Sequence, residues 1–210
     1  MNTFQVSDLQ IAQFQEDGFL MVINLYDQEE MDLLLKIAKA DPEKREMVRS
    51  LQDNQGGESK IWLTSDTDQE DIYNALCHGR RMVDTIEKLM GDEVYLYHYK
   101  MMVKEHQGGG AWEWHQDYGY WYNNGCLYPD MVSCMIAVDR AHKDNGCLQV
   151  LKGSHKLGRI EHGKYGDQTG AHPERVVLAE QHLERVYCEM EPGTGLFFHA
   201  NLLHQSDQNQ

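Results

Sequence analysis

Helical and strand patterns occupy separate parts of this 210-residue chain, and that order restricts its fold more than any other feature. Apolar residues with helical spacing, such as Met31, Leu34 and Leu35, occur before about residue 92. Short apolar segments follow, separated by turn signals such as Asp144-Asn145-Gly146. Because no strand–helix–strand alternation is present, the order predicts a mainly β protein, an antiparallel sandwich or barrel with helical cover.

Local signals place the individual elements. Ser7 and Asp27 each stand three residues before a glutamine or glutamate, which is the spacing of a helix-starting capping box. A further helix is predicted over residues 71–90, with Gly91 as its C-terminal stop. Residues 51–70 are polar with paired glycines and predict a long loop. Short strands are predicted over 93–104, 131–139, 146–153, 185–191 and 195–200.

Length and charge narrow the class of protein. A chain of this length with 41% apolar residues predicts one domain, with residues 1–92 as a mostly helical N-terminal cover and 93–210 as the β core. The net charge of −15 argues against nucleic acid or an anionic membrane as the main partner. The five cysteines form no C-x-x-C pair, which is typical of reduced thiols. With no export signal or membrane span recognisable, we expect a cytoplasmic protein.

The segment WEWHQDYGYWY, residues 112–122, places a histidine and a carboxylate among aromatic rings. Aromatic side chains usually pack in a core, where His115 and Asp117 are costly to bury without partners. In an extended segment, residues i and i+2 project to the same face, so these two side chains can bind one ion from adjacent positions. A second pair, His142 and Asp144, lies in a polar turn and predicts a solvated surface.

A third ligand must come from another part of the chain. His204 is the better candidate because it follows an apolar strand and stands at the end of a short segment that leads into a polar tail. His199 is the rival, but it directly continues the apolar strand and is more typical of a partnered histidine in the core or at its rim. The residues alone favour His204 and leave His199 open.

Two histidines and one carboxylate leave about half of an octahedral metal ion open on one side, as in non-haem Fe(II) oxygenases. Zinc hydrolases use a similar ligand set together with a water molecule. They usually add a general base near the metal, and the helical H-E-x-x-H pattern is absent from this sequence. The pattern therefore favours iron and keeps a zinc hydrolase as the weaker alternative.

Four segments in this order resemble the phytanoyl-CoA dioxygenase family of Fe(II)/2-oxoglutarate-dependent oxygenases. They are FQEDGFLMVINLYDQEE, WHQDYGYW, DNGCLQVLKGSHKLG and EMEPGTGLFFHANLLHQSDQN, and together they extend over nearly the whole chain. The resemblance implies a double-stranded β-helix (jelly roll, cupin-like) with iron held by His115, Asp117 and His204. It also implies that 2-oxoglutarate and O2 are consumed, that a C–H bond of a small molecule is hydroxylated, and that succinate and CO2 are released.

The same resemblance assigns the surroundings of the metal. Ser206 matches the hydroxyl that contacts the far carboxylate of 2-oxoglutarate in the family. Met102 and Trp112 fall where the family lines the cosubstrate pocket. Lys100, on the same strand face as Met102, is a candidate anion contact, although a solvated surface lysine fits this position equally well. The aromatic run supplies the predicted substrate pocket, with Trp121, Tyr118 and Tyr120.

The end of the sequence departs from the family pattern. The family has an arginine a few residues after the serine, where its planar guanidinium pairs with the far carboxylate of 2-oxoglutarate. The sequence ends at Gln210, before that position. A chain that truly ended at Gln210 would lack the C-terminal end of the β core and would be expected to bind 2-oxoglutarate poorly, whereas a chain that continued could supply the arginine. This departure keeps a further hypothesis open, a catalytically inactive jelly-roll protein that binds a small molecule.

The substrate is the least constrained part of the prediction. Related halogenases have a small residue at the position of Asp117, so its presence favours hydroxylation or another oxidative outcome. Residues 140–164 carry six basic side chains against two acidic ones in a strongly acidic chain. We predict that this basic segment faces an anionic group of the substrate, with a solvated loop as the alternative. Its basic residues are Arg140, Lys143, Lys152, Lys156, Arg159 and Lys164.

Overall fold

The computed structural model describes residues 5–40, 49–53, 56–65, 71–106, 108–165 and 167–210. The helices are α1 (Asp8–Asp17), α2 (Gln28–Ala40), α4 (Ile72–Cys77), α5 (Arg80–Met90), α6 (Asp117–Trp121) and α7 (Pro173–His182), with 3-10 turns η1 (Lys143–Asn145) and η2 (Ser154–Leu157). The strands are β1 (Phe19–Val22), β2 (Arg49–Gln52), β3 (Glu58–Ser65), β4 (Tyr99–Val103), β5 (Trp112–His115), β6 (Val132–Ile136), β7 (Leu148–Leu151), β8 (His162–Tyr165), β9 (Gln168–Ala171), β10 (Arg185–Tyr187), β11 (Gly195–His199) and β12 (His204–Ser206).

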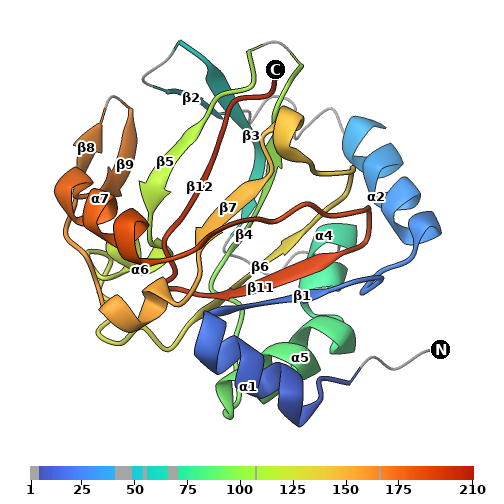
Figure 1. The fold of residues 1–210 in the computed structure, drawn as a ribbon. Helices are drawn as coiled ribbons and strands as arrows, with labels where there is room; N and C mark the ends of the chain where they lie inside the picture. The colour runs from blue at the N-terminus through green and yellow to red at the C-terminus, as the bar shows by residue number, and fades with distance from the viewer. Residues whose placement is uncertain (1–4, 41–48, 54–55, 66–70, 107, 166) are drawn as a thin grey trace.

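The described strands pair antiparallel and form four sheets, in the orders β1-β11-β6, β10-β7-β12-β5, β2-β3-β4 and β8-β9. Figure 1 shows α1 and α5 along one side of β1 and β11, whereas β5, β12 and β7 lie on the other side. The predicted architecture is present in two layers: helices cover the β1-β11-β6 sheet, and the β10-β7-β12-β5 sheet lies on its other side.

Strand β11 lies between the two halves of the core because both of its faces are buried. Phe197 belongs to the cluster formed with the helices, which includes Met31 of α2. Leu196 and Phe198 point the other way and pack in a second cluster with Val150 of β7. Burying a side chain of this size stabilises the fold by about 1.5–3 kcal/mol, so β11 ties the helical layer to the strands that carry the site described below.

The beginning of the chain forms as its capping signals predict. The Ser7 side chain accepts a hydrogen bond from the Gln10 backbone N–H, and the Gln10 side-chain oxygen accepts one from the Ser7 backbone N–H, which starts α1. Gly18 ends this helix in the left-handed conformation, with φ of 82°. Strand β1 follows at once and pairs with β11, Leu20 opposite Phe197. The N-terminal part therefore contributes a strand to the β core as well as helical cover.

The predicted loop over residues 51–70 is wrong where the structure describes it. Residues 49–52 and 58–65 form β2 and β3, and β3 continues the pairing to β4. The strand signal is weak because polar side chains alternate here and find partners. Ser59 is buried and donates to the Gly110 carbonyl, whereas Lys60 pairs with Glu105 at 2.7 Å. Residues 54–55 and 66–70 of the predicted loop lie outside the described residues.

The predicted helix over residues 71–90 consists of two helices, α4 and α5. Gly79 separates them with an extended backbone, φ −62° and ψ 137°, at a residue type with low helix propensity. Gly91 ends α5 in the left-handed conformation as predicted. Of the predicted strand over 93–104, residues 99–103 form β4, and they are half-buried or, at Lys100, exposed, rather than buried on both faces. Among the helices that the structure describes, none has the length and apolar character needed to cross a membrane.

Candidate metal centre

The register of two paired strands brings together the residues predicted as metal ligands. In the antiparallel pair β5–β12, His115 lies directly opposite His204. The chain stays extended at Gln116, with φ −115° and ψ 134°, and Asp117 then begins α6. The extended residue turns the His115 and Asp117 side chains to the same side, as the i, i+2 spacing predicts.

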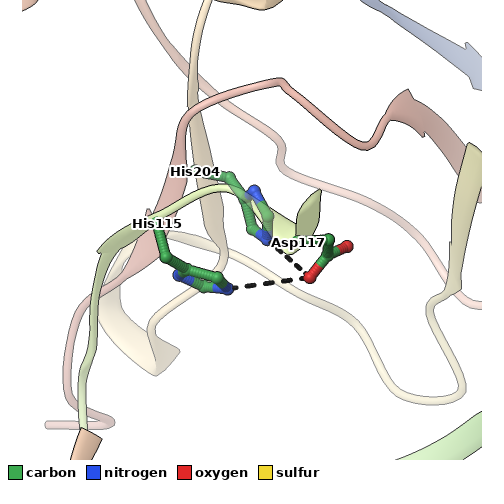
Figure 2. A group of neighbouring side chains, drawn as sticks. All are labelled: His115, Asp117 and His204. Carbon is green, nitrogen blue, oxygen red and sulfur yellow. Dashed lines mark ion pairs between the residues drawn. The ribbon is translucent and has the colours of Figure 1, made fainter. Parts of the chain in front are cut away.

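Figure 2 shows the two imidazole rings directed at one carboxylate oxygen. Asp117 Oδ1 lies 4.0 Å from Nε2 of His115 and 3.8 Å from Nε2 of His204. One potential ligand atom from each of the three residues lies within 4.8 Å of the others. All three side chains are buried, with exposed fractions of 4–8% for the whole residues. This metal triad, His115, Asp117 and His204, leaves room for one ion between its donor atoms.

Backbone hydrogen bonds fix which nitrogen of each ring is free. His115 Nδ1 lies 2.7 Å from the Glu113 carbonyl, and His204 Nδ1 lies 2.9 Å from the Leu202 carbonyl. A carbonyl only accepts hydrogen bonds, so Nδ1 must carry the proton in each ring. The lone pair of each ring is therefore on Nε2, the atom that faces the shared oxygen, which is the tautomer needed for a metal ligand.

The charges of the triad suit a cation. Burial lowers the pKa of His115 well below its usual value, and the neighbouring His204 lowers it further. Burial also lowers the pKa of His204, so both rings are neutral at neutral pH. Burial opposes ionisation of Asp117, but the imidazoles, Lys100 and a hydrogen bond from Ser133 outweigh it and keep the pKa of this carboxyl below its usual value. The buried triad thus carries one negative charge, which a metal ion offsets.

Sequence reasoning missed the residues that hold the triad in place. The most important is Gln116, which is fully buried between two of the ligands. Its amide donates to the carbonyls of Gly158 and Asn201 at 2.8 and 2.7 Å and accepts from the Ile160 amide at 2.7 Å. Its backbone N–H donates to His162 Nε2 at 2.9 Å. Gln116 therefore joins two separate segments beneath the metal triad, residues 158–162 and the turn at Asn201, and only its position inside HQD could have indicated this.

Two of the family-derived cosubstrate residues are close to the triad along the chain: Trp112 lies three residues before His115, and Ser206 lies two residues after His204. Ser206 pairs with Trp112 across β12 and β5. The Trp112 ring lies 6.1 Å from the His115 ring and under the Lys100 ammonium, which is 5.4 Å from its centroid. Met102 lies on β4 opposite Ile61. Trp112 Nε1 is buried and has no hydrogen-bond partner among the described residues.

A second lysine, which the sequence analysis did not single out, reaches the same place. Lys104 Nζ donates to Ser206 Oγ at 2.8 Å and also to the Asp207 carbonyl. Burial lowers the pKa of Lys104 to about 8. The sequence did offer a signal for Lys104: it lies two residues after Met102 and four after Lys100, and residues spaced by two share one face of a strand.

The aromatic residues of the predicted substrate pocket divide into two groups. Tyr120 adjoins the triad, with its ring 5.6 Å from that of His115 and 5.8 Å from that of His162. Its hydroxyl donates to the Thr169 carbonyl at 3.1 Å. Tyr118 and Trp121 instead make their ring contacts with other aromatic residues, Tyr122 for the first and Tyr97 and His98 for the second.

Two competing features of the sequence lie elsewhere. His199 Nδ1 accepts a hydrogen bond from the Asn201 amide at 3.0 Å, and burial lowers its pKa to about 4. It is a partnered histidine at the end of β11 and is not part of the triad. In the basic segment, four side chains form ion pairs with carboxylates: Arg140 with Glu191, Lys152 with Asp17, Lys156 with Glu16, and Arg159 with Glu161. Much of its positive charge is therefore already neutralised.

Comparison with proteins of known sequence gives relatives that act on small molecules according to their names. L-proline trans-4-hydroxylase of Streptomyces griseoviridis is 28% identical, over 68% of this chain and 59% of that protein. Ectoine dioxygenase of Sphingopyxis alaskensis is 26% identical, over 99% of this chain and 72% of that protein. The chain thus spans about three fifths to three quarters of the length of these relatives.

Solved structures confirm the predicted fold. The apo form of EctD from S. alaskensis superposes with a TM-score of 0.80 at 24% identity, over 100% of this chain and 74% of that chain. SnoK, an α-ketoglutarate-dependent carbocyclase of nogalamycin biosynthesis, gives a TM-score of 0.79 at 16% identity, over 97% and 78%. The chain adopts the jelly-roll fold of these proteins. The family described as phytanoyl-CoA dioxygenase matches residues 14–210, and the chain belongs to that family.

Proposed function

We propose that this protein is a non-haem Fe(II)/2-oxoglutarate-dependent dioxygenase that hydroxylates a C–H bond of a small molecule and releases succinate and CO2. The observation that carries the proposal is the metal triad, in which two Nε2 atoms and one carboxylate oxygen converge. Two histidines and one carboxylate on one side of an ion are the ligand set of non-haem Fe(II) oxygenases. Family membership and the names of the relatives support the same assignment.

The surrounding residues suit this chemistry. When bound, Fe(II) and 2-oxoglutarate together with O2 supply the oxidising power for hydroxylation. The chain holds His115 and His204 in the metal-binding tautomer through backbone carbonyls. It covers them with the Tyr120 and Phe198 rings, which lie 5.6 Å from His115 and 4.8 Å from His204. These rings restrict the access of water to the centre and so protect it from side reactions.

We extend the proposal to an anionic substrate that meets Arg159. The loop around Arg159 is tied to the metal triad, because Gln116 binds both of its neighbours, Gly158 and Ile160. The Arg159 guanidinium lies 4.3 Å from the centroid of the Tyr122 ring. Its Nη1 is buried without a hydrogen-bond partner among the described residues. An arginine with an unused donor suits a carboxylate or phosphate group of a substrate.

The five cysteines are free thiols in the structure. Because disulfides persist mainly in oxidising compartments, we propose that the protein works in a reducing one, the cytoplasm.

The first experiment is an anaerobic titration of the protein with Fe(II) and 2-oxoglutarate, followed by the weak visible charge-transfer band of the chelate. A band that His115→Ala abolishes supports the oxygenase. Absence of the band, with Fe(II) still bound, supports the inactive binding protein instead. Tight binding of Zn(II) together with hydrolysis and no chelate band supports the zinc hydrolase.

The substrate is then sought among small carboxylic acids, including L-proline and ectoine, as a compound whose addition stimulates the release of succinate from 2-oxoglutarate. For an anionic substrate, Arg159→Gln raises KM and leaves the chelate band unchanged. Lys164→Gln, in the same basic segment, is the matched control and leaves KM unchanged. Equal KM values in wild type and Arg159→Gln contradict the role of Arg159.

A further inference from the structure

The side chains of β4 alternate between two environments. Tyr99 and Met101 pack against the helical core cluster. Because successive strand residues point to opposite faces, Lys100, Met102 and the following Lys104 are directed away from the helices. Contacts of the two lysines agree with this, since they reach Trp112 of β5 and Ser206 of β12. One face of β4 is thus directed at the sheet that carries the metal triad.

Ser206 fixes the distance of this position from the metal. It follows His204 by two residues on β12, so the two side chains share a face about 7 Å apart along the strand. In 2-oxoglutarate, the far carboxylate carbon lies three carbons beyond the keto carbon. A molecule of this length, held at the metal by its keto end, is long enough to reach Ser206 with its other end.

Lys104 is a partly buried ammonium group without a carboxylate partner among the described residues. It donates to Ser206 Oγ and to the Asp207 carbonyl, but it forms no ion pair there. The neighbouring carboxylates are engaged elsewhere. Asp207 accepts from Gln149 at 2.6 Å, and Asp53 accepts from the Ala111 amide at 2.7 Å. A cation in this environment is stabilised by an anionic ligand, because burial without a counter-charge is costly.

The Trp112 indole is an independent sign of a ligand at the same place. Its N–H is buried without a hydrogen-bond partner among the described residues, although buried polar groups are almost always paired. Trp112 is also the strand partner of Ser206. The Lys104 ammonium and the Ser206 hydroxyl thus lie at one end of the Ser206–Trp112 strand pair, and the indole N–H of Trp112 adds a buried donor that has no acceptor among the described residues.

We infer that Lys104, with Ser206 and Trp112, forms the seat of the far carboxylate of 2-oxoglutarate, and that Lys104 is its counter-ion. The inference rests on the proposed function and assigns to this strand a residue that positions the cosubstrate. Lys104 gives the far carboxylate a cation from within the described residues.

The test compares two ligands that differ only at the far end. Wild type and Lys104→Met are titrated anaerobically, with Fe(II) bound, against 2-oxoglutarate and against 2-oxobutyrate, which chelates in the same way but has no second carboxylate. The chelate band gives Kd without any turnover. Loss of a charge-assisted contact is expected to raise Kd for 2-oxoglutarate about 10- to 100-fold. The Kd for 2-oxobutyrate is expected to stay the same.

Two further variants keep the result interpretable. Lys88→Met, which removes one positive charge from the exposed surface of α5, is the control and is expected to leave both Kd values unchanged. Lys104→Arg retains the charge and is expected to recover most of the affinity for 2-oxoglutarate. An unchanged Kd in Lys104→Met, or an equal loss for both ligands, overturns the inference. If wild type gives no band with either ligand, the proposed function itself is wrong.

Discussion

The two ends of the proposed cosubstrate site differ in how their polar groups are satisfied. At the metal end, each imidazole donates to a backbone carbonyl, Ser133 orients Asp117, and Gln116 uses its whole amide. At the other end, which we call the carboxylate end, Lys104 forms no ion pair and the Trp112 N–H lacks an acceptor among the described residues. The hydrogen bonds of the metal end are thus made within the protein, whereas the carboxylate end has donors that a ligand can satisfy.

The largest effect is expected from breaking the metal end. Asp117→Ala removes the one charged ligand and is expected to abolish Fe(II) binding, measured by anaerobic equilibrium dialysis. Ser133→Ala leaves the ligand in place but removes the 2.5 Å hydrogen bond that orients it. Loss of such an outer contact typically lowers metal affinity 10- to 100-fold, so Ser133→Ala is expected to bind weakly rather than not at all. Equal affinity in Ser133→Ala and wild type contradicts an orienting role.

The next effect concerns stability. Gln116→Ala leaves the Gly158 and Asn201 carbonyls and the Ile160 amide without partners in a buried region. Unsatisfied buried groups cost about 1–3 kcal/mol each, and partial relaxation gives an expected loss of about 3 kcal/mol in the free energy of unfolding. Urea denaturation measures it.

Gln149→Ala is the matched control, because Gln149 is equally buried but its partners Asp207 and Arg185 lie nearer the surface. Water can replace its hydrogen bonds, so a loss of about 1 kcal/mol is expected. Equal losses in the two variants contradict the claim that Gln116 has a special role at the metal end.

The same contrast explains how far the sequence could predict the structure. The fold was predictable because the order of elements is a local signal, and Ser7, Gly91 and the apolar β11 act as their types predict. Strands β2 and β3 were not, because Ser59 and Lys60 are polar and are stabilised by partners distant in the sequence. Short-range pattern cannot show such pairing.

The candidate site divides in the same way. His115 and Asp117 form one short motif whose spacing carries its own geometry. The role of Gln116 depends on loops 42 and 85 residues away, and the contact of Lys104 with Ser206 spans 102 residues. Family resemblance supplied Ser206 but not Lys104. Contacts of this kind appear only once β4, β5 and β12 are placed next to one another.

A pH dependence separates the two ends further. Burial lowers the pKa of Lys104 to about 8, while Cys147 beside it stays neutral because burial raises its pKa to about 11. Asp207 and Asp53 also face Lys104 and partly oppose the effect of burial. Below pH 8 the lysine is charged and can bind a carboxylate. Above pH 8 it loses the proton, so Kd for 2-oxoglutarate is expected to rise towards tenfold per pH unit.

The chelate band measured between pH 7 and 9 checks this expectation. Lys104→Arg is the control, because arginine stays protonated throughout this range and its profile should be flat. 2-Oxobutyrate should also give a flat profile in wild type. A rise that is the same for both ligands would place the titrating group at the metal end and contradict the assignment to Lys104.

The smallest effect is expected at the basic segment, which lies outside both the metal end and the carboxylate end. Lys152 and Lys156 pair with Asp17 and Glu16 of α1, at 3.2 and 2.6 Å, with side chains 42% and 48% exposed. Exposed ion pairs contribute little because water and salt screen them. The double charge reversal Lys152→Glu and Lys156→Glu should therefore lower Tm slightly, and less at high salt, while Kd for 2-oxoglutarate stays unchanged.

The double charge reversal also distinguishes two explanations of cosubstrate binding, a general effect of surface charge and a local contact with Lys104. If the overall field of the acidic chain sets the affinity for the 2-oxoglutarate anion, the reversal increases the repulsion and weakens binding, and added salt screens the repulsion and restores binding. If a local contact with Lys104 is responsible, the reversal has no effect on Kd, although it changes the charge by four units against the single unit lost in Lys104→Met. A Kd that follows net charge rather than position would remove the distinction between the carboxylate end and the rest of the surface.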